Sequence, residues 1–220
     1  MTRVVLARHG ETLWHAENRY AGVSDVPLTL RGRQQAAFLA NWAGAAGLDA
    51  VWASPLSRSR QTAAVCAKVC DLSVRVDERL REVDFGAGEG LTTGEMAARF
   101  PAALQAFREN PVAHHLPGGE HPVDAAARFV AALQDFSVER PDGRILVVAH
   151  TTVIRLAVCR LIGVPLVHYR RVFPMLRNCG RTELSIDSNG AAVIEFNTPI
   201  ERDWPVAPGV GESADLPPAR

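Results

Sequence analysis

Lysine is almost missing from this chain of 220 residues. Lys68 is the only lysine among the 24 basic residues, and all the others are arginines. A P-loop, which needs a lysine beside the nucleotide phosphates, is therefore excluded, and Schiff-base chemistry would have to use Lys68 alone. The base composition of a genome explains most of such a bias, although arginine is also the better two-pronged ligand for phosphate and carboxylate.

The chain also lacks net charge and long apolar runs. Its 24 basic residues balance 24 acidic ones, so no net basic field exists to hold nucleic acid or an anionic membrane by charge alone. No apolar run is as long as the about 18 residues that a transmembrane helix needs. The apolar stretch at residues 4–7 is too short for a signal peptide. We therefore expect a cytoplasmic protein with neither nucleic acid nor membrane as a partner.

Cysteine is scarce. Cys66 and Cys70 lie four residues apart in a helical pattern, which is neither a redox CxxC motif nor a zinc-binding spacing. We expect these two, Cys159 and Cys179 to be reduced residues in or near the core.

Apolar residues make up 47 % of the chain, which is enough to build a core. The length suits one α/β domain with a small insertion. We expect a single domain over residues 1–197, with an insertion at about residues 84–120. A C-terminal tail rich in proline and glycine is expected over residues 198–220.

Short apolar runs alternate with segments of helical periodicity. Strands are expected at residues 3–7, 49–53, 72–76, 144–149, 182–186 and 192–196, and helices at residues 30–46, 54–70, 95–109, 122–138 and 151–162. This alternation predicts an α/β fold, a three-layer α/β/α sandwich with a mostly parallel sheet. The last two strands flank Asn189-Gly190, a strong hairpin signal, and should add an antiparallel edge.

Several local signals mark where these elements begin and end. Thr29 is expected to cap the first helix, and Ser54 to cap the second with Pro55 at its first position. Between residues 84 and 120, glycines and prolines flank the expected helix at 95–109. We interpret this segment as a small helical cap inserted over one face of the sheet.

Polar residues follow three of the expected strands. Arg8 and His9 follow the first, Ser54 and Arg58 the second, and His150 the long central one. Ligands of such sheets bind beyond the carboxyl ends of the strands. Two arginines and a helix N-terminus suit a tetrahedral oxyanion, and a neutral imidazole beside them can attack phosphorus. One histidine at a strand end is more often structural, but two with two arginines favour a phosphate site.

The same residues lie in longer motifs. Residues 8–12, Arg-His-Gly-Glu-Thr, resemble the RHG signature of the histidine phosphatase superfamily, which includes the cofactor-dependent phosphoglycerate mutases. The similarity continues at residues 25–36, 54–63, 80–90 and 147–155, so that about five motifs follow in the family's order over residues 3–197. The RHG motif alone is a weak signal, but the whole set is specific.

The resemblance implies a role for five residues. His9 would be the nucleophile that becomes phosphohistidine, and Arg8, Arg58 and His150 would bind the phosphoryl oxygens. Glu82 would protonate the leaving alkoxide and then deprotonate the water that hydrolyses phosphohistidine. It also implies that neither a metal nor another cofactor is needed, and that the enzyme is a phosphomonoesterase similar to the histidine acid phosphatases.

Asp84 and Glu89 are rival candidates for the acid. The position within the motif favours Glu82, whereas the chemistry of the three carboxylates does not separate them.

Two positions depart from the family's pattern. Family members often have a phosphate-binding asparagine where His15 stands. His15 can still donate one N–H and could become charged near neutral pH, and Asn18 is a candidate substitute. Many members have glycine after the second histidine, where Thr151 stands here, and its backbone N–H could bind phosphate. Gly22 completes the candidate substrate-binding residues.

The absence of consecutive arginines in residues 111–120 favours a phosphatase over a mutase. A mutase must retain a bisphosphorylated intermediate, for which the mutase pattern provides a second cationic group in the cap. We therefore expect a metal-independent phosphomonoesterase that acts through phosphohistidine on a small phosphorylated metabolite. Phosphoryl transfer of the phosphoglycerate mutase type, or a non-catalytic protein that binds phosphate for regulation, are the alternatives. A homodimer through the edge hairpin stays open.

Overall fold

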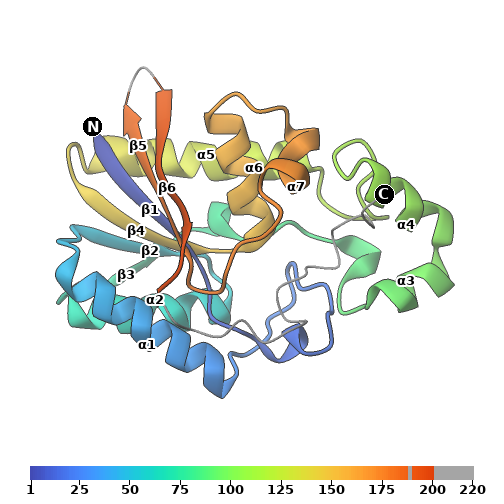
Figure 1. Cartoon of the computed structure of the whole chain (residues 1–220), viewed down its shortest axis with the longest axis horizontal. Helices are drawn as coiled ribbons and strands as arrows, with labels where there is room; N and C mark the ends of the chain where they lie inside the picture. The colour runs from blue at the N-terminus through green and yellow to red at the C-terminus, as the bar shows by residue number, and fades with distance from the viewer. Residues whose placement is uncertain (188–189, 201–220) are drawn as a thin grey trace.

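A computed structural model describes residues 1–187 and 190–200 of the chain. In this part of the chain, one sheet of six strands has the order β3-β2-β4-β1-β5-β6 (Figure 1). The strands are β1 (Thr2–Arg8), β2 (Ala50–Ala53), β3 (Val74–Val76), β4 (Arg144–Ala149), β5 (Arg181–Asp187) and β6 (Gly190–Thr198). The first four of these strands run parallel to one another, whereas β5 pairs antiparallel with β1 and with β6. The expected α/β fold with a mostly parallel sheet is confirmed.

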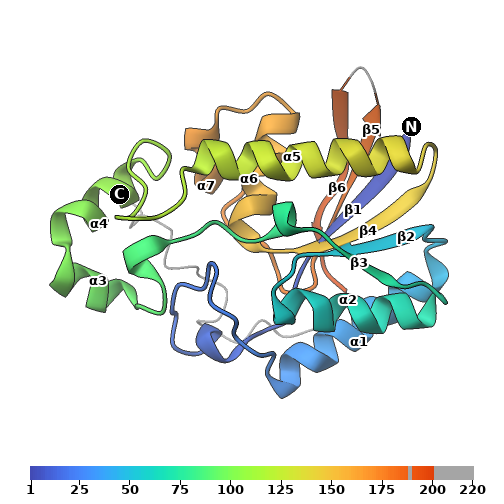
Figure 2. The same ribbon diagram turned by 180° about the vertical axis from the view of Figure 1, so that it is seen from behind.

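Helices cover both faces of this sheet. They are α1 (Leu30–Ala45), α2 (Ser57–Val69), α3 (Thr93–Arg99), α4 (Pro101–Glu109), α5 (Pro122–Glu139), α6 (Thr151–Leu161) and α7 (Tyr169–Val172). Short 3-10 turns are η1 (Leu13–His15), η2 (Glu78–Leu80), η3 (Gly86–Gly88) and η4 (Leu166–His168). Figures 1 and 2 show α1 and α2 on one face and α5 and α6 on the other.

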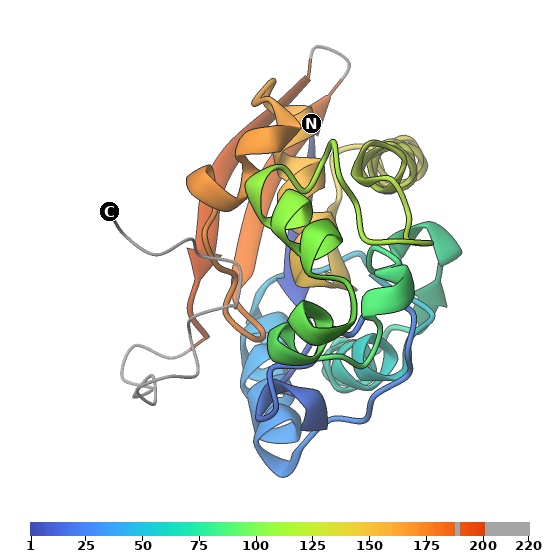
Figure 3. The ribbon, with the colours of Figure 1, turned by 90° about the vertical axis from the view of Figure 1, so that its right-hand side faces the viewer.

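The alternation of side chains along β1 explains the layers. Val5 and Ala7 pack with residues of α1 and α2, whereas Val4 and Leu6 pack with residues of α5 and α6. Successive side chains of a strand point to opposite faces, so one strand contributes to both halves of the core. The segment with α3 and α4 stands apart from these layers, in front of them in Figure 3.

The expected cap of the second helix is wrong. The helix begins at Ser57 and not at Ser54, and its N-terminal Ser57 N–H donates to Asp25 Oδ1 at 2.8 Å. The Ser54 hydroxyl lies 2.7 Å from His150 Nε2 instead. Asp25, from a distant loop, therefore caps the helix in place of Ser54. The expected cap of the first helix is confirmed, since the Thr29 side chain accepts the Gly32 N–H.

The single helix expected at residues 95–109 is also wrong, because α3 and α4 meet at Phe100 and Pro101. A proline disfavours helical backbone in the residue before it, and Phe100 has φ −147° and ψ 66°. The helix therefore stops and restarts at the proline.

Three further expectations concern the hairpin, the tail and the cysteines. Asp187 pairs with Gly190 across the antiparallel β5 and β6, but the turn at residues 188–189 lies outside the described residues, as do residues 201–220 of the expected tail. Cys66, Cys159 and Cys179 are free and buried, and Cys70 is free and half-buried. No helix in the described part of the chain is long and apolar enough to cross a membrane.

The backbone of the loop after β1 packs directly against the backbone of the first turn of α1. A Cβ atom at Gly32 would collide with the carbonyl oxygen of Glu11, whereas a Cβ atom at Gly44, in the same helix, would meet nothing nearer than Val69 Cγ2 at 3.8 Å. Gly32→Ala should therefore lower the free energy of unfolding by about 1–3 kcal/mol, the usual cost of overpacking. Gly44→Ala should raise it by about 0.5–1 kcal/mol, because alanine favours helix over glycine.

Urea denaturation of the two variants and the parent protein measures both changes. A Gly32→Ala protein as stable as Gly44→Ala would contradict the close approach of the loop to the helix.

Candidate active site

The carboxyl ends of β1 and β4 bring two histidines together. His9 and His150 are buried, and their ring centroids lie 5.1 Å apart. The His15 ring, from η1, lies 6.0 Å from that of His9. Arg58, from the start of α2, donates from Nε to His150 Nδ1 at 3.3 Å. The residues that follow three different strands therefore lie close together, as expected.

His9 is held as a neutral imidazole with one free nitrogen. Its Nδ1 lies 2.7 Å from the carbonyl oxygen of Gly10, which can only accept a hydrogen bond. The proton therefore sits on Nδ1, and Nε2 keeps its lone pair. Burial and then the charge of Arg58 lower the pKa of His9 well below its ordinary value. The group that could act as a nucleophile is thus unprotonated at neutral pH.

Arg58 is a buried cation that is held by backbone oxygens. The residue is only 1 % exposed. Its Nη1 donates to Ser24 O at 2.6 Å, and its Nη2 donates to Ala21 O and Gly22 O at 3.1 and 2.8 Å. Neutral carbonyls fix the guanidinium without cancelling its charge, so the site stays positive.

The loop that holds Arg58 is itself held by Glu89. The Glu89 carboxylate accepts the N–H groups of Gly22 and Val23 at 2.8 and 3.2 Å and the hydroxyl of Ser24 at 2.7 Å. This rival candidate for the acid is therefore occupied in binding a loop. The N–H of Gly22, expected near the substrate, is also engaged there, and a Cβ atom at this position would collide with Glu89 and with the carbonyl of Val83.

His150 is oriented from both sides. Its Nδ1 accepts from Arg58, so its proton sits on Nε2, which donates to the Ser54 hydroxyl at 2.7 Å. Burial, and then the charge of Arg58, lower the pKa of His150 well below its ordinary value.

Glu82 is 2 % exposed and sits at the N-terminus of α6. Its Oε2 accepts the N–H of Thr152 and its Oε1 that of Val153, both at 2.9 Å, and Oε1 also accepts the N–H of Val83. The N-terminus of a helix carries partial positive charge and favours a carboxylate. Asp84 is half-buried and accepts only the N–H of Gly86 in its own turn. The three carboxylates, which their chemistry alone does not separate, therefore differ in their contacts.

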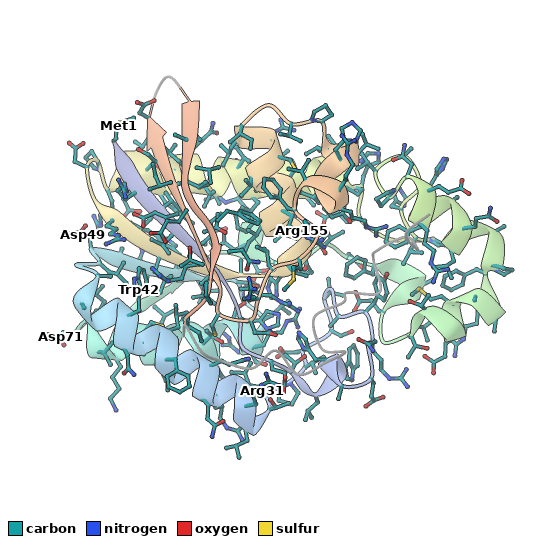
Figure 4. All side chains as sticks on the ribbon, viewed as in Figure 1. Met1, Arg31, Trp42, Asp49, Asp71 and Arg155 are labelled. Carbon is teal, nitrogen blue, oxygen red and sulfur yellow. The ribbon has the colours of Figure 1, made fainter. Side chains whose placement is uncertain are left out.

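Arg8 lies at the end of β1 and is half-buried. Its Nη1 donates to Leu176 O at 2.7 Å, and its Nε has no hydrogen-bond partner. Burial, and then the nearby charge of Arg155, lower the pKa of Arg8 to about 10. Arg155 comes from α6, in the middle of the molecule (Figure 4). The Nε–H of Arg8 is therefore a buried donor without an acceptor in the described part of the chain.

His15 does not behave as expected. Its Nδ1 accepts the N–H of Thr12 at 3.0 Å and lies 2.8 Å from the Thr12 hydroxyl, and its Nε2 faces Arg8 Nη2 at 2.5 Å. Both ring nitrogens are thus used within the protein. Burial, and then the charge of Arg8, lower the pKa of His15 to about 3. The expectation that His15 becomes charged near neutral pH is wrong.

Asn178 is a site residue that the sequence did not reveal, whereas Asn18 is exposed on a turn with φ +52°. The Nδ2 of Asn178 donates to His9 O at 3.0 Å and lies 3.4 Å from His15 Nε2. Asn178 precedes β5, which runs antiparallel to β1, so the beginning of β5 lies beside the end of β1. The antiparallel direction of β5, which the sequence predicted, is the signal that could have pointed to Asn178.

Thr151 is the first residue of α6, directly after His150, as expected, and its carbonyl accepts from Arg155 Nε at 3.2 Å.

Among the described residues, no group of three or more His, Cys, Asp or Glu side chains is placed to hold a metal ion.

A family model described as the histidine phosphatase superfamily (branch 1) matches residues 4–199. The curated relatives include a protein of Enterobacter sp. strain 638 named probable phosphoglycerate mutase GpmB. It is 36 % identical over 180 residues, which cover 81 % of this chain and 82 % of the relative.

Solved structures agree with this match. Bacillus stearothermophilus YhfR has a TM-score of 0.86 and 30 % identity, and the match covers 91 % of this chain and all of that one (100 %). A mycobacterial glucosyl-3-phosphoglycerate phosphatase, solved as a complex with VO3, has a TM-score of 0.81 and 29 % identity, and covers 89 % of this chain and 99 % of its own. The family expected from the motifs is confirmed.

The depressed pKa of His15 predicts how stability depends on pH. In the unfolded chain His15 takes up a proton below its ordinary pKa of 6.5, but in the folded protein only near 3. The free energy of unfolding should therefore fall as the pH decreases below about 6.5, by about 1.4 kcal/mol per pH unit for this one group. His15→Asn should remove that contribution and make the dependence shallower by about this slope.

Denaturant unfolding at several pH values between 7 and 4 tests this expectation, with His114→Asn, on an exposed loop, as the matched control. Equal slopes for His15→Asn and the parent protein would show that His15 is not buried as a neutral ring.

Proposed function

Because the chain belongs to the histidine phosphatase superfamily, branch 1, we propose that it is a metal-independent phosphomonoesterase that acts through phosphohistidine. Its substrate would be a small phosphorylated metabolite. The observation that carries the proposal is His9, a buried neutral imidazole whose free Nε2 lies among buried cations.

In the first step, the lone pair of His9 Nε2 attacks phosphorus. The N–P bond forms as the ester P–O bond breaks, and Glu82 gives its proton to the leaving oxygen. Arg8, Arg58 and His150 stabilise the charge on the phosphoryl oxygens. The guanidinium groups of Arg8 and Arg58 donate mainly to neutral backbone carbonyls, so their charge can balance that of the phosphoryl group.

In the second step, water attacks the phosphorus of phosphohistidine. Glu82, which became a carboxylate when it gave up its proton in the first step, accepts the proton of the water. The N–P bond breaks, phosphate leaves, and the electron pair returns to His9 Nε2. His15, Asn18, Gly22 and Thr151 stay candidate substrate-binding residues in this proposal.

Phosphoglycerate mutase activity is the second candidate, since a curated relative carries that name. The absence of consecutive arginines in residues 111–120 favours the phosphatase, because a mutase needs a second cationic group in the cap. We propose segment 84–120 as a cap within one domain, residues 1–197. A cytoplasmic location and a homodimer stay predictions.

The purified protein should hydrolyse p-nitrophenyl phosphate in the presence of EDTA, and vanadate should inhibit it as an analogue of the transferring phosphoryl group. His9→Ala should lower kcat by at least about 10³-fold, the usual scale for a lost nucleophile that leaves only binding groups. His114→Ala, in an exposed loop, serves as the control and should keep normal activity.

Normal turnover by His9→Ala, or complete loss of turnover in EDTA, would contradict the proposed mechanism. Isomerisation of phosphoglycerate that depends on bisphosphoglycerate, and that exceeds hydrolysis of the same compound, would favour the mutase.

A further inference from the structure

Arg128, on α5, makes several side-chain hydrogen bonds outside the phosphoryl site. Its side chain is 13 % exposed. Its Nε donates to Glu120 Oε1 at 2.7 Å and its Nη2 to Glu120 Oε2 at 2.8 Å. This two-pronged pair fixes the plane of the guanidinium group.

The opposite edge of the same guanidinium holds the backbone that carries Glu82. Its Nη1 donates to Arg79 O at 2.7 Å and to Arg81 O at 2.8 Å, and its Nη2 donates to Glu82 O at 3.0 Å. A guanidinium group has five N–H donors, and all five therefore have an acceptor. Nothing in this arrangement is left for a substrate.

Glu82 is consequently fixed from two directions. Its carboxylate is held by the first turn of α6, and its backbone carbonyl by Arg128 of α5. The two helices pack against each other in the core through residues such as Phe129 and Ile154. Glu120 extends the contact, since it also accepts from Arg81 at 3.3 Å and from the N–H of Asp84 at 3.4 Å.

We propose that Arg128, with Glu120 as its partner, is the positioning residue that aims the Glu82 carboxyl group at the leaving oxygen. The inference rests on the proposed function, in which Glu82 is the acid. A displacement of about 1 Å in a catalytic group can cost about 10²-fold in rate. Lysine cannot replace the arginine, because one ammonium group cannot reach five acceptors arranged around a plane.

A positioning role predicts a rate loss that depends on the leaving group. An alkoxide needs a proton as its P–O bond breaks, whereas p-nitrophenolate leaves readily without one. A displaced Glu82 should therefore slow phosphorylation of His9 by an alkyl phosphate far more than by p-nitrophenyl phosphate. General damage to the fold or to the phosphoryl site would slow both reactions equally.

The experiment measures phosphorylation of His9 in a single turnover by rapid quench, with 3-phosphoglycerate and with p-nitrophenyl phosphate. Glu82→Gln, which cannot give a proton, sets the scale and should lower the alkyl rate by about 10²-fold relative to the aryl rate. Arg128→Lys should lower the same ratio by about 10-fold. Arg79→Lys is the control, since the Arg79 side chain binds Asp77 and Asp135 and not the Glu82 backbone, and it should leave the ratio unchanged.

Equal losses with both esters in Arg128→Lys, or an unchanged ratio, would overturn the inference. If thermal unfolding shows that Arg128→Lys does not fold, Glu120→Gln takes its place. It should lower the ratio by about 3-fold, and an equal effect on both esters would again overturn the inference. If the parent protein forms no phosphohistidine with either ester, the proposed function fails instead, so the two failures are distinguishable.

Discussion

The site depends on the burial of positive charge that forms no direct ion pair with a carboxylate in the described part of the chain. Arg58 donates to three backbone carbonyls and a histidine, and Arg8 to a carbonyl and a histidine. Burial of a guanidinium group is costly unless its donors find acceptors, which is why two loops bring carbonyl oxygens to the carboxyl ends of the strands. The same burial keeps His9 and His150 neutral. In the function proposed above, the charge of a phosphoryl group offsets this field, and the neutral imidazole of His9 is the form that attacks it.

Around this charge, a residue from a distant part of the chain holds each group to which we assign a role in the reaction. Glu89 holds the loop that holds Arg58, Asn178 holds the backbone of His9, and Arg128 holds the backbone of Glu82. A phosphoryl transfer site has little covalent chemistry to perform beyond the nucleophile, so most of its catalysis comes from position and electrostatics. The structure accordingly fixes these residues with hydrogen bonds from separate segments of the chain.

The sequence predicted those parts of the molecule that depend on local pattern. The apolar run of β4, the Thr29 cap and the alternation of strands with helices identified the layers, and residues after strand ends identified His9, Arg58 and His150. Predictions failed where a distant group competes with a local one. Asp25 caps α2 because the Ser54 hydroxyl is bound to His150, and burial beside Arg8 lowers the pKa of His15. Asn178 and the contacts of Glu89 join segments far apart in sequence, which periodicity cannot show.

The central claim is that His9 Nε2 carries the phosphoryl group during turnover. Rapid quench of the working enzyme with a labelled phosphate ester, followed by peptide mass spectrometry, tests it most directly. The account predicts phosphate on the peptide that contains His9, stable to base and labile to acid, at up to one group per chain, and none in His9→Ala. Steady turnover with no labelled protein under any quench time, or label on another residue that persists in His9→Ala, would contradict it.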